Sequence, residues 1–178
     1  IPGVGHPDRP VFDVVGEVYD DSKGIPLPGV TVIHGEQSVL TDDRGRFAVP
    51  TQQSLARLRF EREGFTAVER TQIVHASRGT LVLDARLTPL GSETRVVGPN
   101  GGTLTDGSIE LMVPPQALST ELEMRLTPVS SQGLRAPLPP GWSPIASVDI
   151  LPESVTFSVP ATLRVYDVLS GLDAGDRV

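Results

Sequence analysis

Four aspartates in two short acidic turns are the residues of this sequence best suited to hold a metal ion. They are Asp20 and Asp21, then Asp42 and Asp43, and a glycine follows each pair within three residues. Ca²⁺ takes six to eight oxygen ligands, and two acidic turns at one end of a sandwich could supply several. Neither turn has EF-hand spacing, and aspartate and glycine also serve as turn formers. We interpret the aspartates first as turn residues and second as weak calcium candidates.

The histidines give little support to a catalytic or zinc site. His6, His34 and His75 are far apart in sequence and form none of the short spacings that ligate zinc. His34 falls on a predicted strand, where we expect a satisfied structural role. The sequence has no cysteine and no Gly-x-Ser-x-Gly motif, which removes thiolate chemistry and the common hydrolase elbow. We expect no catalytic residue, no cofactor and no enzymatic activity.

The single tryptophan is the one candidate for a partner or ligand contact. Trp142 stands in a proline-rich stretch, Pro139-Pro140-Gly141-Trp142-Ser143-Pro144. An aromatic side chain on such a loop could contact a carbohydrate or a protein. It could also plug the end of its own sandwich, and we favour the plug because tryptophan is usually largely buried.

Composition and charge narrow the function further. The formal net charge is −7, which argues against nucleic acid as a partner. No stretch approaches the ~20 apolar residues of a membrane span, so we expect no direct membrane insertion. The absence of cysteine fits a bacterial extracellular protein and equally a cytosolic one, and the first residue is isoleucine rather than methionine. We therefore expect a fragment or a processed product of a longer protein.

The sequence predicts an all-β fold with two tandem antiparallel β-sandwich domains. Glycine (18) and proline (17) are abundant, as expected for many short strands joined by turns. Residues 1–10 form an extended leader, and residues 11–90 form the first sandwich. Period-2 alternation and turn signals place its main strands at 14–19, 30–34, 39–41, 46–50, 55–61, 68–74 and 80–87.

A linker at residues 91–96 precedes the second sandwich, residues 97–178. Its expected strands are 102–104, 108–113, 122–128, 145–151, 156–157 and 161–166. Six strands leave a sandwich open on one edge, and an open edge invites pairing. We expect this domain to be truncated, and completed by the remainder of the parent polypeptide or by another chain.

Four motifs of the first domain occur in the order typical of the carboxypeptidase regulatory-like family. They are Val15-Gly16-Glu17-Val18, Gly24-Ile25-Pro26-Leu27-Pro28-Gly29-Val30-Thr31-Val32, Thr41-Asp42-Asp43-Arg44-Gly45-Arg46-Phe47 and Glu63-Gly64-Phe65. The domain therefore resembles that family, and the resemblance implies a transthyretin-type, immunoglobulin-like sandwich with an interaction role.

The second domain resembles the ZU-five β-sandwich of ankyrins and netrin receptors. The motifs that carry this resemblance are Gly101-Gly102-Thr103-Leu104, Ile109 to Leu118, Val148-Asp149-Ile150 and Pro152 to Ala161. Some ZU-five relatives cleave themselves at His-Phe-Ser. Thr156-Phe157-Ser158 lacks the histidine, so self-cleavage is not expected there.

This pairing of modules resembles the region ahead of the shell in bacterial YD-repeat proteins of the Rhs and teneurin-like class. Those are large secreted or surface polypeptides, and some carry toxins. The resemblance implies a non-catalytic stalk, plug or docking segment of a bacterial protein that is extracellular or on the cell surface. The alternative is an adhesin-like or carbohydrate-binding module that uses Trp142 and the acidic turns.

Overall fold

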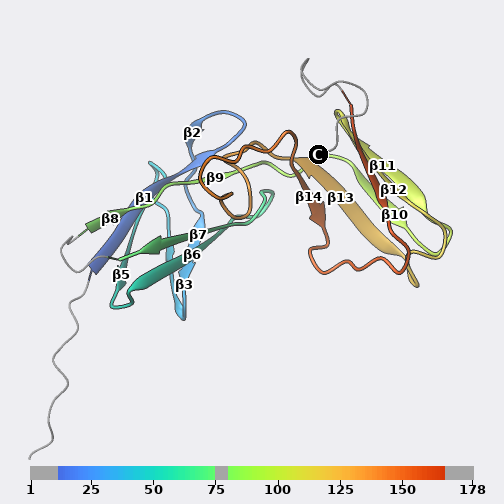
Figure 1. Ribbon diagram of the computed structural model, residues 1–178. Helices are drawn as coiled ribbons and strands as arrows, with labels where there is room; N and C mark the ends of the chain where they lie inside the picture. The colour runs from blue at the N-terminus through green and yellow to red at the C-terminus, as the bar shows by residue number, and fades with distance from the viewer. Residues whose placement is uncertain (1–11, 75–79, 167–178) are drawn as a thin grey trace, which may run out of the picture. The chain divides into compact units, whose positions relative to one another are not determined.

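The computed structural model describes residues 12–74 and 80–166. Within these ranges the regular secondary structure consists of β-strands, without a helix (Figure 1). The predicted all-β, sandwich-type fold class is confirmed. The chain divides into two compact units. Unit 1 ends at Leu87 and also includes Arg135–Pro137, and unit 2 begins at Thr88. The predicted leader, residues 1–10, lies outside the described residues.

The described residues of unit 1, 12–74 and 80–87, form nine strands in two sheets. In the first sheet β1 is central, with β5 and the short β2 antiparallel to it and β8 and β9 parallel to it. The second sheet is antiparallel, in the order β4-β3-β6-β7. The strands are β1 Phe12–Asp20, β2 Ile25–Pro26, β3 Thr31–His34, β4 Gln37–Leu40, β5 Arg46–Thr51, β6 Leu55–Glu61, β7 Val68–Ile73, β8 Thr80–Val82 and β9 Ala85–Leu87.

The core of unit 1 forms between its two sheets. Along β5, exposed and buried residues alternate strictly, so that Phe47 and Val49 point inward. Phe47 meets Phe60 of β6 edge to face, with ring centroids 5.4 Å apart and an interplanar angle of 70°. The contact joins the two sheets, and it gives the aromatic residue near the start of β5 a place in the core.

The segment predicted as one strand, residues 80–87, is interrupted between β8 and β9. At the interruption the Leu83 carbonyl lies so close to Gly16 that a Cβ on Gly16 would be 2.0 Å from its oxygen. The Asp84 carboxylate accepts the Glu17 N–H at 2.8 Å, in place of a main-chain partner. Gly16 therefore permits a close backbone approach that another residue would block.

Up to residue 166, where the described part of the chain ends, unit 2 forms six strands in two three-stranded antiparallel sheets, ordered β10-β13-β14 and β11-β12-β15. Their buried side chains form one core that includes Val97, Leu104, Leu111, Met124 and Leu126. The strands are β10 Thr94–Val97, β11 Gly102–Asp106, β12 Ile109–Val113, β13 Leu122–Pro128, β14 Val148–Leu151 and β15 Thr162–Val165.

Two details of unit 2 differ from the sequence prediction. Strand β10 begins at Thr94, inside the segment assigned as a linker (91–96), because β10 pairs with β13. Residues 156–157 are not a strand. Phe157 packs against the core from an irregular connection, where the Ser158 N–H donates to the Ala117 carbonyl at 2.9 Å. Side-chain burial, rather than strand pairing, thus holds this connection in place.

Candidate functional site

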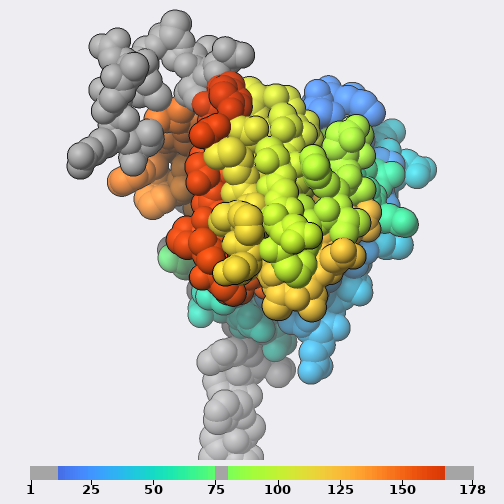
Figure 2. Space-filling view, turned by 90° about the vertical axis from the view of Figure 1, so that its right-hand side faces the viewer, coloured from blue at the N-terminus to red at the C-terminus, as the bar shows by residue number. Residues whose placement is uncertain are grey.

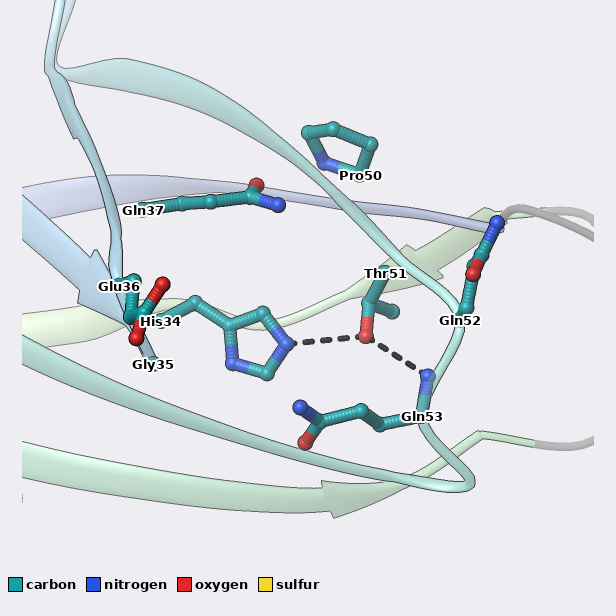
Figure 3. Close-up of a pocket in the computed structure, with 8 residues that line it drawn as sticks. All are labelled: His34, Gly35, Glu36, Gln37, Pro50, Thr51, Gln52 and Gln53. Carbon is teal, nitrogen blue, oxygen red and sulfur yellow. Dashed lines mark hydrogen bonds between the residues drawn. The ribbon is translucent and has the colours of Figure 1, made fainter.

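An open hollow of about 780 Å³ lies at one end of unit 1. Its walls come from the β3–β4 turn on one side and from the end of β5 with the residues that follow on the other. The lining residues are His34, Gly35, Glu36, Gln37, Pro50, Thr51, Gln52 and Gln53 (Figure 3). Figure 3 shows the side chains of Gln37 and Gln53 on either side of the His34 ring. The hollow can offer amide and carboxylate groups to a polar ligand.

His34 at the base of the hollow is buried and bonded through both ring nitrogens. Its Nδ1 lies 2.9 Å from the Arg57 carbonyl oxygen, which can only accept, so Nδ1 carries the proton. Its Nε2 lies 2.9 Å from Thr51 Oγ1. In the neutral ring Nε2 accepts from the threonine hydroxyl, which in turn accepts the Gln53 N–H at 3.1 Å.

The pair of His34 and Thr51 resembles a base beside a nucleophile, but its surroundings indicate a structural link. Both residues are buried, and Thr51 Oγ1 already serves two partners. His34 belongs to β3 and Thr51 to β5, so the hydrogen bond joins the two sheets at the end of the core. His34 thus has the satisfied structural role expected from its place on a strand.

Asp20 ends β1 and organises the first acidic turn. Its Oδ1 accepts the Ser22 N–H at 2.9 Å, the Ser22 hydroxyl at 2.6 Å and the Lys23 N–H at 3.2 Å. Burial opposes the charge of this carboxylate, but the bonds from Ser22 and Lys23 outweigh burial and lower its pKa. Asp20 therefore acts as the acceptor that closes the turn.

Asp42 plays the same part in the second acidic turn. Its Oδ1 accepts the main-chain N–H groups of Arg46 and Arg44, each at 2.8 Å, and these bonds lower the pKa of its carboxyl. The register of β1 against β5 pairs Glu17 with Arg46, so both turns lie at one end of this sheet.

Within the described residues, the acidic turns bring together fewer than three potential metal ligands. No group of three or more histidine, cysteine, aspartate or glutamate side chains within residues 12–74 and 80–166 could hold a metal ion. One oxygen each of Asp20 and Asp42 is bonded to main-chain N–H groups. The geometry of Asp20 and Asp42 supports the turn-forming interpretation that we placed first; Asp21 and Asp43 remain untested calcium candidates.

Trp142 is exposed, and the expectation that it plugs its sandwich was wrong. Its side chain is 73% exposed. The Trp142 N–H donates to the Pro139 carbonyl at 3.1 Å, and Gly141 has a φ of 88°. Proline and then glycine at the two central positions are typical of a type II turn. The turn is therefore closed by main-chain bonding and leaves the indole in solvent.

The side of unit 2 formed by β15 is incompletely covered. Leu104, Leu111 and Leu163 form one row across the sheet β11-β12-β15, because Leu111 is the register partner of both other leucines. Residues opposite one another in a sheet share a face. Leu104 is 5% exposed and Leu111 is 3% exposed, whereas Leu163 is 45% exposed. The face of the sheet that packs against the core thus extends to β15, but at β15 it is not fully covered by other side chains.

Two sets of site residues were not identified from the sequence. Three glutamines line the hollow. Gln37 begins β4, whereas Gln52 and Gln53 lie in the connection after β5, so the packing of the two sheets decides whether they come close together. Leu163 was placed on a strand, but alternation alone does not show which edge of a sheet a strand occupies. The adjacent glutamines Gln52 and Gln53, between β5 and β6, were the sequence feature that could have indicated the hollow.

Comparisons with protein families and with curated proteins give no match. The solved structures that this chain resembles include three Bacteroides proteins. A candidate membrane-associated protein of unknown function from Bacteroides fragilis is 18% identical, with a TM-score of 0.38. A candidate carbohydrate binding protein from Bacteroides uniformis is 17% identical, with a TM-score of 0.33, and a DUF3823 family protein from Bacteroides ovatus is 16% identical, with a TM-score of 0.33.

The matches cover only part of each protein. They cover 50%, 56% and 58% of this chain, and 31%, 50% and 54% of the respective neighbours. Across residues 12–74 and 80–166, no helix has the length and apolar character needed to cross a membrane.

Proposed function

We propose that this chain is a non-catalytic structural module that docks within a larger bacterial secreted or surface polypeptide. The observation that carries the proposal is the row of leucines in unit 2, which is buried at β11 and β12 and exposed at β15. An apolar core face left uncovered at a sheet edge favours association. The module order that resembles YD-repeat proteins supports the same role.

The interior chemistry is consistent with a structural role. The buried histidine is engaged by Thr51 and a main-chain carbonyl, and the two turn carboxylates are engaged by main-chain N–H groups. These groups stabilise the fold of unit 1. In unit 2, the exposed side chain of Leu163 remains available for a partner.

The proposal is tested by hydrogen exchange of this chain alone and within its full natural polypeptide. We expect unit 2 to exchange at least about tenfold more slowly in the full polypeptide, which corresponds to ~1.4 kcal/mol. Unit 1 serves as the internal control and should exchange at the same rate in both. Equal exchange of unit 2 in the two proteins would show that it does not dock.

A second candidate function, glycan binding, is favoured by the exposure of Trp142. A solvent-exposed indole offers a flat apolar face against which a sugar ring can stack. In this alternative Trp142→Phe should retain part of the binding to an immobilised glycan panel, and Trp142→Ala should abolish it. Binding that is unaffected by Trp142→Ala would exclude this residue as the contact.

A further inference from the structure

The free edge of β15 exposes main-chain groups as well as apolar side chains. In an antiparallel pair, residues alternate between those whose N–H and C=O face the partner strand and those whose groups face away. The Tyr166 N–H donates to the Ser108 carbonyl at 2.7 Å, which makes Tyr166 a partner-facing residue. By alternation Arg164 also faces β12, while the N–H and C=O groups of Leu163 and Val165 point to the free edge.

The same two residues turn their side chains toward the core. Leu163 is opposite Leu111, and Val165 is opposite Ile109, and both β12 residues are buried. Among the described strands, none pairs with β15 on the side away from β12. Figure 2 shows β15 as a red band along one margin of the sheet, beside β12. Leu163 and Val165 thus combine main-chain groups that no other described residue pairs with and apolar side chains that are incompletely covered.

The outer face of β15 is polar and satisfied. Arg164 Nη1 lies 3.6 Å from Glu110 Oε2, and the Tyr166 hydroxyl donates to the same oxygen at 2.6 Å. An added strand would place one set of its side chains beside Leu163 and Val165 and the alternate set beside Arg164. Apolar residues suit the first set, and neutral or acidic residues suit the second, because like charges opposite one another are unfavourable.

We propose that a β-strand from the same polypeptide, outside these 178 residues, pairs with β15 and covers Leu163. This inference rests on the proposed docking function and names the partner. The strand has apolar residues at alternate positions and an acidic or neutral residue opposite Arg164. Strand addition to a sheet edge is a common mode of recognition, with affinity from main-chain bonds and specificity from alternate side chains.

The size of the edge favours a strand of the same polypeptide over a separate molecule. A strand of four residues spans about 13 Å. Pairing along such a short edge buries less than the ~1,200 Å² of surface that stable interfaces between independent molecules bury. A covalent connection raises the effective concentration of the strand to the millimolar range. Residues 167–178 include three aspartates and two glycines, which are depleted in strands. We therefore assign the strand to the polypeptide beyond them.

Amide exchange at Leu163 and Val165 tests the inference directly. In the 178-residue chain we expect both amides to exchange rapidly. In the full natural polypeptide we expect both to exchange at least ~100-fold more slowly. Rapid exchange in both proteins would overturn the inference. Protection in the 178-residue chain that increases with protein concentration would instead assign the edge to a second copy and would also overturn it.

A matched pair of variants isolates the edge hydrogen bond. Val165→Pro removes an N–H that faces the free edge and leaves the ladder to β12 intact, since proline is tolerated on an edge strand. In the full polypeptide this variant should return the Leu163 amide to rapid exchange, while Val165→Thr should keep it protected. The Arg164 amide, which faces β12, should remain protected in both variants and confirms that the strand has folded.

The outcomes separate the strand from the docking function. If unit 2 is stabilised in the full polypeptide but Leu163 and Val165 still exchange rapidly, docking stands and the added strand is wrong. If unit 2 is not stabilised and the two amides exchange rapidly, both proposals are wrong.

Discussion

Leu163 lies directly opposite Leu111 on the neighbouring strand, yet Leu111 is 3% exposed and Leu163 is 45% exposed. The two leucines point to the same face of one sheet. The difference between their exposed fractions therefore shows how far other side chains cover that face. This cover extends over β12 and stops short of β15. The incomplete covering of this sheet face is thus confined to β15.

This asymmetry predicts different costs for the same substitution. Leu111→Ala should lower the free energy of unfolding by about 2–4 kcal/mol, because it leaves a cavity in a packed core. Leu163→Ala should lower it by less than about 1 kcal/mol in the same 178-residue chain, because less apolar surface is lost from the interior. Urea unfolding followed by circular dichroism measures both. Equal costs would mean that Leu163 is covered in solution.

The hydrogen bond between His34 and Thr51 predicts a loss of stability when the threonine hydroxyl is removed. Thr51→Val preserves the shape of the side chain but leaves His34 Nε2 and the Gln53 N–H without their shared partner. We expect a loss of about 1–3 kcal/mol, the usual cost of buried polar groups without partners. Thr51→Ser retains the hydroxyl and is the control. Unfolding of both variants in urea is the measurement, and a neutral Thr51→Val would refute the structural role of the link.

The strands were largely predictable because their signals are local. Alternation along β5 and β6 and the glycine-containing turns follow from short stretches of sequence. The interruption between β8 and β9 depends on Gly16, some 67 residues earlier, as shown by the bond from the Glu17 N–H to Asp84. The exposure of Trp142 and Leu163 depends on which elements cover them, and no local pattern encodes that.

Fluorescence of Trp142 tests its exposed position. Trp142 is the sole tryptophan, so the emission of the protein reports on this residue alone. We expect emission typical of a solvated indole, acrylamide quenching close to that of a free tryptophan derivative, and little change on unfolding. Trp142→Ala should change the free energy of unfolding by less than about 0.5 kcal/mol, as for most surface substitutions. A blue-shifted, protected emission would return Trp142 to the interior.

Calcium should have no effect on the stability of unit 1. Asp20 and Asp42 each use an oxygen to accept main-chain N–H groups, and the described residues contain no group of three potential ligands. We expect the same thermal unfolding temperature in millimolar calcium chloride and in a chelator. A calcium-dependent increase that disappears in Asp42→Asn would reveal a metal site at these turns.

The lowered pKa of Asp20 predicts a specific acid sensitivity. The folded protein favours the carboxylate, so protonation occurs first in the unfolded chain, near the ordinary aspartate value of 3.8. The stabilisation from Asp20 is therefore complete above that pH and is lost as the pH falls through the lower pKa of the folded state. We expect Asp20→Asn to be less stable than the wild type near neutral pH, and the difference to shrink in strong acid. Urea unfolding of both proteins across this range measures the difference, and a gap that stays constant with pH would exclude Asp20 as its source.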